Sequence, residues 1–129
     1  MIHFRTQRQA PHLVIELSGE VSGASVRSEL ADLPAALSTL PPDFVMMVVY
    51  PNLLRVADDA LGALFYFVAH LFDADPGLCT FVDGGKSPHP GLRNFIQRVA
   101  RDDQLVFVPT QTDAEAHIEA YLQTRNASR

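Results

Sequence analysis

The hydrophobic and polar positions of the chain change period several times, and each change predicts a new element. Residues 2–7 and 12–18 alternate apolar and polar side chains, which is typical of β-strands, and the short turn between them predicts an antiparallel pair. From Ser22 to Leu40 the apolar residues recur at spacings of four and three, which predicts a helix with Ser22 as its N-cap. Pro34 is expected to kink or restart this helix.

After residue 40 the chain alternates between short apolar runs and helical stripes. Continuous apolar runs are typical of strands that helices bury on both faces. The runs are residues 44–50, 78–82 and 105–109, and the stripes are residues 59–73, 92–99 and 112–124. Thr112 followed by Glu115 is the pattern of a capping box at the start of the last helix. The order β-β-α-β-α-β-α-β-α therefore predicts an α/β fold with a mixed sheet packed by helices.

The composition predicts one compact domain over residues 1–129, with residues 124–129 as a frayed polar tail. The 129 residues are 47% hydrophobic and 19% charged. A net charge of −5 without a run of Lys or Arg argues against nucleic-acid binding. The longest apolar stretch, interrupted by His70, is shorter than the roughly 20 residues that span a bilayer. The lone Cys79 is expected to be a buried hydrophobe, and a cytoplasmic location follows as the default.

No set of residues predicts catalysis. The five histidines (His3, His12, His70, His89 and His117) lack the spacings of metal sites, and no serine lies in a nucleophile elbow. We therefore expect no catalytic residues, no metal and no cofactor, and a protein that is not an enzyme.

Two adjacent carboxylates, Asp58 and Asp59, stand where an apolar run gives way to a helix. Such junctions lie at the tip of the sheet, where α/β domains commonly place ligands and partner contacts. One interpretation is that either carboxylate caps the helix that follows, which is worth about 1–2 kcal/mol. The other is that the pair presents fixed negative charge to a partner. The sequence leaves both interpretations open.

Three segments, together with the order of elements, resemble the STAS domain family of anti-sigma factor antagonists across residues 10–122. "LSGEVSGASV" is similar to the family's strand and first helix start, and "FVMMVVYPNLLRVADDALGALF" to its buried strand, loop and second helix start. "FVPTQTDAEAHI" is similar to its last strand and terminal helix. The resemblance implies a STAS-like fold and a regulatory module that binds other proteins.

In family members that act as phosphorylation switches, a serine or threonine at the start of the second helix is phosphorylated by a partner kinase. The match places Asp59 on that position, with Asp58 beside it, and Tyr50-Pro51 where the family usually has an aspartate. The resemblance thus implies constitutive docking of an anti-sigma or kinase-like protein. The implied partner-binding residues are Glu20, Ser22, Arg55, Asp58, Asp59 and Gly62.

The alternative is a small-ligand or lipid-binding domain of the same β-α sandwich type. The helix over residues 59–73 holds Phe65, Phe67 and Phe72, more aromatic bulk than one buried stripe requires. Tyr66 and Phe67 lie off the main stripe, which is compatible with a pocket for a lipid-like ligand or with a homodimer contact.

Overall fold

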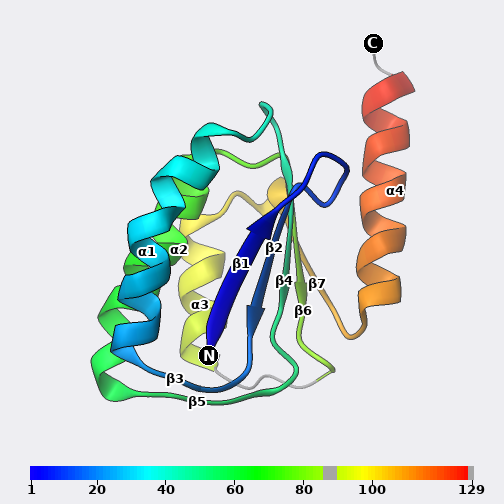
Figure 1. The fold of residues 1–129 in the computed structure, drawn as a ribbon. Helices are drawn as coiled ribbons and strands as arrows, with labels where there is room; N and C mark the ends of the chain where they lie inside the picture. Colours follow the sequence, from blue (N-terminus) through cyan, green and yellow to red (C-terminus); the bar gives the residue numbers. More distant parts are fainter. Residues whose placement is uncertain (86–89, 128–129) are drawn as a thin grey trace.

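The computed structural model describes residues 1–85 and 90–127 and shows helices on both faces of a central sheet (Figure 1). The strands are β1 (Ile2–Thr6), β2 (Leu13–Leu17), β3 (Gly19–Val21), β4 (Val45–Val49), β5 (Leu53–Val56), β6 (Leu78–Val82) and β7 (Leu105–Val108). The helices are α1 (Gly23–Ser38), α2 (Leu61–Asp73), α3 (Pro90–Val99) and α4 (Gln111–Ala127), with 3-10 turns η1 (Asp58–Ala60) and η2 (Asp102–Gln104). None of the helices described here is both long and apolar enough to cross a membrane.

The central sheet has five strands in the order β1-β2-β4-β6-β7. β1 runs antiparallel to β2, and β2, β4, β6 and β7 run parallel to one another. This confirms the predicted α/β class with a mixed sheet packed by helices. Because the four parallel strands share a direction, their carboxyl ends meet at one end of the molecule, where α1, α2 and α3 also begin (Figure 1).

Successive side chains of each strand enter two different cores, because side chains alternate along a strand. Ile15 and Met46 point toward the main core, which α1, α2 and α3 cover. Val14 and Met47 point to the opposite face and pack with Ala114 of α4. Of the helices in the described residues, α1, α2 and α3 thus cover one face of the sheet and α4 covers the other (Figure 1).

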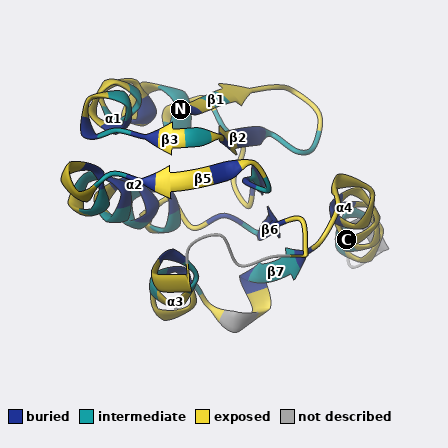
Figure 2. Cartoon of the chain, turned by 90° about the horizontal axis from the view of Figure 1, so that it is seen from below, coloured by how far each residue is buried: buried dark blue, intermediate teal, exposed yellow. Residues whose placement is uncertain are grey.

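A second sheet, formed by β3 and β5, is absent from the sequence prediction. The two strands pair in parallel, with Glu20 opposite Arg55, and lie side by side at the end of the main sheet (Figure 2). They contain only three and four residues, too few to show a repeating pattern. Gly19, at φ 57°, turns the chain from β2 into β3 in a left-handed conformation that glycine adopts without strain.

Helix α1 runs through Pro34 without the expected restart. A proline leaves the carbonyl four residues earlier, here that of Leu30, without its helical donor. Pro34 lies on the exposed side of α1, so water can supply that donor. The helix is therefore continuous from Gly23 to Ser38, and the expected restart at Pro34 is wrong.

Helix α4 begins earlier and extends further than the sequence predicted. The Thr110 hydroxyl accepts a hydrogen bond from the Asp113 N–H at 3.2 Å, so Thr110, and not Thr112, caps the helix. At the other end Arg125 donates to the carbonyl oxygens of Asp43 at 3.2 Å and Pro42 at 3.4 Å. These bonds tie α4 to the loop before β4, and residues 124–127 are helical where a frayed tail was expected.

His12 extends the pairing of β2 with β4 through its side chain. The His12 N–H donates to the Val45 carbonyl at 2.9 Å, and His12 Nδ1 accepts from the Val45 N–H at 3.0 Å. Only a neutral imidazole can accept this bond. Burial, together with the positive charge of Arg125, lowers the pKa of His12 below the ordinary 6.5.

We therefore expect stability to fall as the pH drops below 6.5. The folded protein binds this proton less readily than the unfolded chain, so the contribution of His12 is present above 6.5 and is lost toward and below its folded pKa. Thermal melts between about pH 7.5 and about pH 5.5 should show a falling midpoint. His12→Asn should flatten this slope, whereas His117→Asn, on the exposed side of α4, should leave it unchanged. Equal slopes in wild type and His12→Asn would contradict the assignment.

Candidate partner-binding site

The structure brings the candidate site residues to one end of the molecule. Figure 2 views this end directly and shows β3 and β5 side by side, with β3 leading toward the start of α1 and β5 toward the start of α2. Ser22 is half-buried and the other five side chains or backbones are exposed. Glu20 lies in β3, Arg55 in β5, Ser22 just before α1, Asp58 and Asp59 in η1, and Gly62 in the first turn of α2.

Ser22 is the N-cap of α1, as the sequence predicted. Its backbone is extended, at φ −94° and ψ 158°, and its hydroxyl accepts a hydrogen bond from the Ser25 N–H at 3.2 Å. This bond satisfies one of the amides that the first turn of a helix leaves without a partner. Ser22 therefore defines where α1 begins beside β3.

Neither Asp58 nor Asp59 caps the helix that follows them. The N-cap positions of η1 and α2 are Ala57 and Ala60, and neither helix has a side-chain cap. Instead Asp59 Oδ1 accepts a hydrogen bond from the Gly23 N–H, at 3.3 Å, in the first turn of α1. The capping interpretation is thus wrong for α2, because the carboxylate of Asp59 serves a helix that begins 36 residues earlier.

Gly23 is the closest point between α1 and η1, and sequence analysis missed it. A Cβ at this position would lie 2.7 Å from the Asp59 carbonyl oxygen, 2.8 Å from Asp59 Oδ2 and 2.9 Å from Arg27 Nη1. These distances leave no room for a side chain. A glycine after an N-cap is too common to signal such an approach, which depends on a contact distant in sequence.

The surface beside the two helix starts carries an exposed leucine and several charged side chains. Leu54 of β5 is 83% exposed. Arg55 Nη1 and Glu20 Oε2 are 4.0 Å apart and both side chains are exposed, so their ion pair contributes little stability. Asp58 is exposed and makes no hydrogen bond or ion pair within the parts of the chain that the structure describes.

A second polar cluster lies at the ends of β4 and β6. Asp83 is buried and accepts a hydrogen bond from the Gly85 N–H at 2.8 Å. Arg93 of α3 lies 3.8 Å from Asp83 Oδ2 and stacks over the ring of Phe107 at 4.2 Å. Burial, and secondarily the charge of Asp83, raise the pKa of Tyr50 to about 12, against the opposing effect of Arg93. The Tyr50 phenol thus stays protonated, and Arg93 fastens α3 to the sheet.

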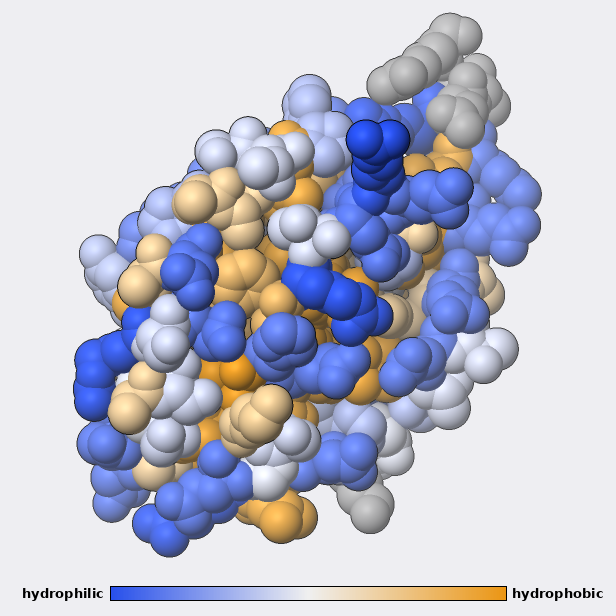
Figure 3. Space-filling model, viewed as in Figure 1, coloured by the Kyte–Doolittle hydropathy of each residue, from blue (hydrophilic) through white to orange (hydrophobic). Residues whose placement is uncertain are grey.

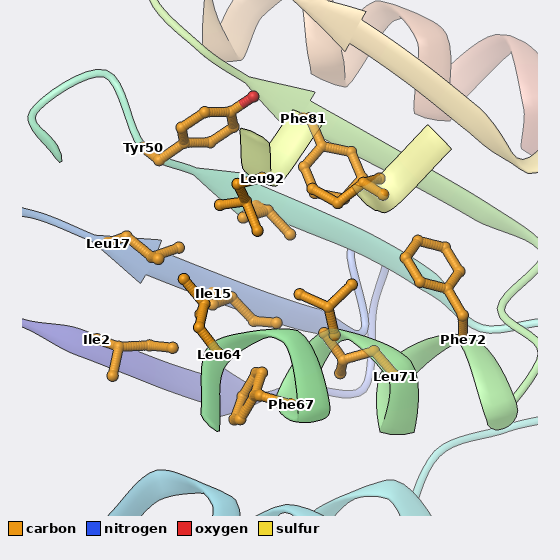
Figure 4. Close-up of a pocket in the computed structure, with 13 residues that line it drawn as sticks. Ile2, Ile15, Leu17, Tyr50, Leu64, Phe67, Leu71, Phe72, Phe81 and Leu92 are labelled. Atoms are coloured by element: carbon orange, nitrogen blue, oxygen red, sulfur yellow. The ribbon is translucent and has the colours of Figure 1, made fainter. Parts of the chain in front are cut away.

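An apolar cavity of about 20 Å³ lies between the sheet and helices α2 and α3 (Figure 4). Ile15, Leu64, Phe67 and Leu92 are among its lining residues. In this measure a single water needs about 10–15 Å³, so the cavity has no room for an acyl chain. On the face shown in Figure 3, hydrophilic and hydrophobic residues are interspersed. Phe67, expected off the main stripe, is 1% exposed and belongs to the core, whereas Tyr66 is 58% exposed.

Within residues 1–85 and 90–127, no three His, Cys, Asp or Glu side chains are grouped so that they could hold a metal ion. His89 lies outside these residues. Cys79 is buried in β6, and burial raises the pKa of its thiol. A protonated, inaccessible thiol behaves as a small hydrophobe, as the sequence predicted.

Solved structures share this arrangement of strands and helices. No family model matches the chain, and no curated protein matches its sequence. An uncharacterized protein of the DUF3478 family from Shewanella loihica PV-4, described as having a SpoIIAA-like fold, superimposes with a TM-score of 0.65 at 16% identity, over 89% of this chain and 91% of that one. The chain has the SpoIIAA-like fold.

Two further structures extend the comparison to SpoIIAA itself. The anti-sigma factor antagonist SpoIIAA in its unphosphorylated form gives a TM-score of 0.59 at 15% identity, over 91% of this chain and 98% of that one. The Bacillus cell fate determinant SpoIIAA in the phosphorylated form gives 0.55 at 16% identity, over 90% and 99%. The SpoIIAA-like fold confirms the STAS resemblance at the level of fold. Function has to be argued from the site.

Proposed function

We propose that this protein is a non-enzymatic regulatory module that docks a protein partner at the end of the sheet where β3, β5 and the starts of α1 and α2 meet. The observation that supports this most is the exposed surface there, with Leu54 extended into solvent and Asp58 without a partner among the described residues. Protein interfaces combine apolar contacts with complementary charges, and this surface offers both. The likeness to an anti-sigma factor antagonist supports the same role by fold analogy.

Docking in this proposal is constitutive and takes place in the cytoplasm. By the resemblance, η1 carries Asp58 and Asp59 where phosphorylation-switched STAS domains carry a hydroxyl, so a serine or threonine kinase has no hydroxyl to phosphorylate at these two positions. A carboxylate carries one negative charge against nearly two for a phosphoserine. In this proposal docking therefore does not depend on phosphorylation at the start of the second helix. The partner-binding set is Glu20, Ser22, Arg55, Asp58, Asp59 and Gly62.

Native mass spectrometry of the tagged protein, isolated gently from its own host, tests this function. We expect a stoichiometric polypeptide in the spectrum, and Asp58→Lys should weaken its binding about tenfold because the charge of an unpaired side chain is reversed. Gln123→Lys, at an exposed position of α4 outside the surface, is the control. A lipid-sized adduct would support the ligand-binding alternative, and a bare chain or homodimer would overturn the docking proposal.

A further inference from the structure

The proposed docking surface is made of two segments that are distant in sequence. One contains β3, Ser22 and the first turn of α1, and the other contains β5 and η1. Pairing of β3 with β5 joins them at one place, with Val21 opposite Val56. The Ala57 N–H continues this pairing by donating to the Val21 carbonyl at 2.9 Å. Beyond these strands the chain enters two helices that pack against each other, and a second contact joins the helix starts themselves.

Asp59 and Gly23 make that second contact. The Asp59 carboxylate accepts the Gly23 N–H at 3.3 Å, and it meets the positive end of the 16-residue helix α1. The carbonyl oxygen of Asp59 also lies against Gly23, 2.7 Å from the point that a Cβ would occupy. Both the side chain and the backbone of η1 are therefore packed against the first residue of α1.

The neighbouring carboxylate, that of Asp58, is also exposed, as Asp59 is, but it has no hydrogen bond or ion pair in the described part of the molecule. Its carboxylate can therefore form an ion pair with a cationic group of another molecule. The two adjacent aspartates thus have different surroundings, although the sequence alone does not distinguish them.

We propose that Asp59 is a positioning residue that holds the start of α1 against η1, and that Asp58 is the carboxylate that receives a cationic side chain of the partner. This inference rests on the docking function proposed above and assigns a different role to each of the two adjacent aspartates. An arginine suits this role best, because its guanidinium can bind a carboxylate through two parallel hydrogen bonds. In the bound state Asp59 sets the geometry and Asp58 makes the contact.

Amide hydrogen exchange followed by NMR on the full chain tests the role of Asp59 without any partner. Asp59→Ala should speed exchange of the Gly23 amide about fivefold, because one charge-assisted hydrogen bond is lost. The Ser25 amide, which donates to Ser22 and not to Asp59, should change less. Asp59→Asn keeps an acceptor oxygen and should restore the Gly23 rate, and Asp58→Ala is the matched control. Equal rates in Asp58→Ala and Asp59→Ala would overturn the positioning role.

The polypeptide identified by native mass spectrometry, once purified, tests whether Asp58 contacts the partner and Asp59 only positions the start of α1. Asp58→Asn should weaken binding about tenfold and reduce its salt dependence, whereas Asp59→Asn should weaken it less than about threefold. Equal losses, or a larger loss in Asp59→Asn, would overturn the division. If no polypeptide is found, the docking function fails, while the exchange rates still decide whether Asp59 holds α1 against η1.

Discussion

Replacing Phe67 by alanine is expected to lower the free energy of unfolding by about 3–5 kcal/mol, the usual cost of removing a buried phenylalanine. Phe67 is 1% exposed, packs against Phe4 with ring centroids 6.2 Å apart, and lines the cavity between α2 and the sheet. Without the ring, a large void opens in an apolar surrounding that water does not fill favourably. The thermal midpoint should fall by about 10–20 °C.

Tyr66→Ala provides a matched control on the next residue of the same helix. Tyr66 is largely exposed and contacts His70 edge to face, with centroids 4.5 Å apart, so its removal should change stability by no more than about 0.5 kcal/mol. Benzene should raise the midpoint of Phe67→Ala and leave the wild type unchanged, since only the variant has room for it. Equal losses in both variants would contradict the assignment of Phe67 to the core.

Replacing Gly23 by alanine is expected to cost about 1–3 kcal/mol and to weaken partner binding, although alanine is the better helix former. The added methyl would meet the Asp59 carbonyl oxygen at 2.7 Å, which belongs to the backbone and cannot rotate away. The start of α1 and η1 must therefore separate. Denaturant unfolding and binding of the co-purified polypeptide measure the two effects.

Gly62→Ala is the control, because it makes the same substitution in the other helix start. No atom lies within 4 Å of a Cβ built at Gly62, and its backbone is helical. Alanine should therefore stabilise α2 by up to about 1 kcal/mol. A stabilised Gly62→Ala that also loses binding would indicate that the partner packs against the bare backbone at Gly62. A Gly23→Ala protein as stable as wild type would contradict the close approach.

The elements with a repeating pattern could be predicted from the sequence, and those without one could not. The stripe of α2 follows from its helical period, and β4 and β6 follow from their continuous apolar runs. β3 and β5 are too short for a period, and their pairing depends on chain segments more than thirty residues apart. The N-cap of α4 was misplaced by two residues because both Thr110 and Thr112 are followed three residues later by an acidic side chain.

In the candidate site, too, local features could be predicted from the sequence and tertiary contacts could not. The position of Asp58 and Asp59 at the sheet end follows from the order of strand and helix. Their different roles do not, because a side-chain bond from Asp59 to Gly23 is a tertiary contact with no local signature. The exposure of Leu54 was equally hidden, since a leucine in an apolar stretch is more often buried.

Among the described helices, only α4 covers the second face of the sheet, and this affects how the protein unfolds. Its inner side chains, such as Ala114 and Ile118, and the Arg125 bonds to the loop before β4 hold it in place. Detachment of one helix breaks fewer contacts than rupture of the main core, so α4 should open first as a unit. In the opened state the apolar side chains of Val14 and Met47 would be exposed to solvent. Such an exposed apolar sheet face promotes self-association. We therefore expect the rate of aggregation in concentrated solution to depend on the free energy of α4 detachment more than on the free energy of global unfolding.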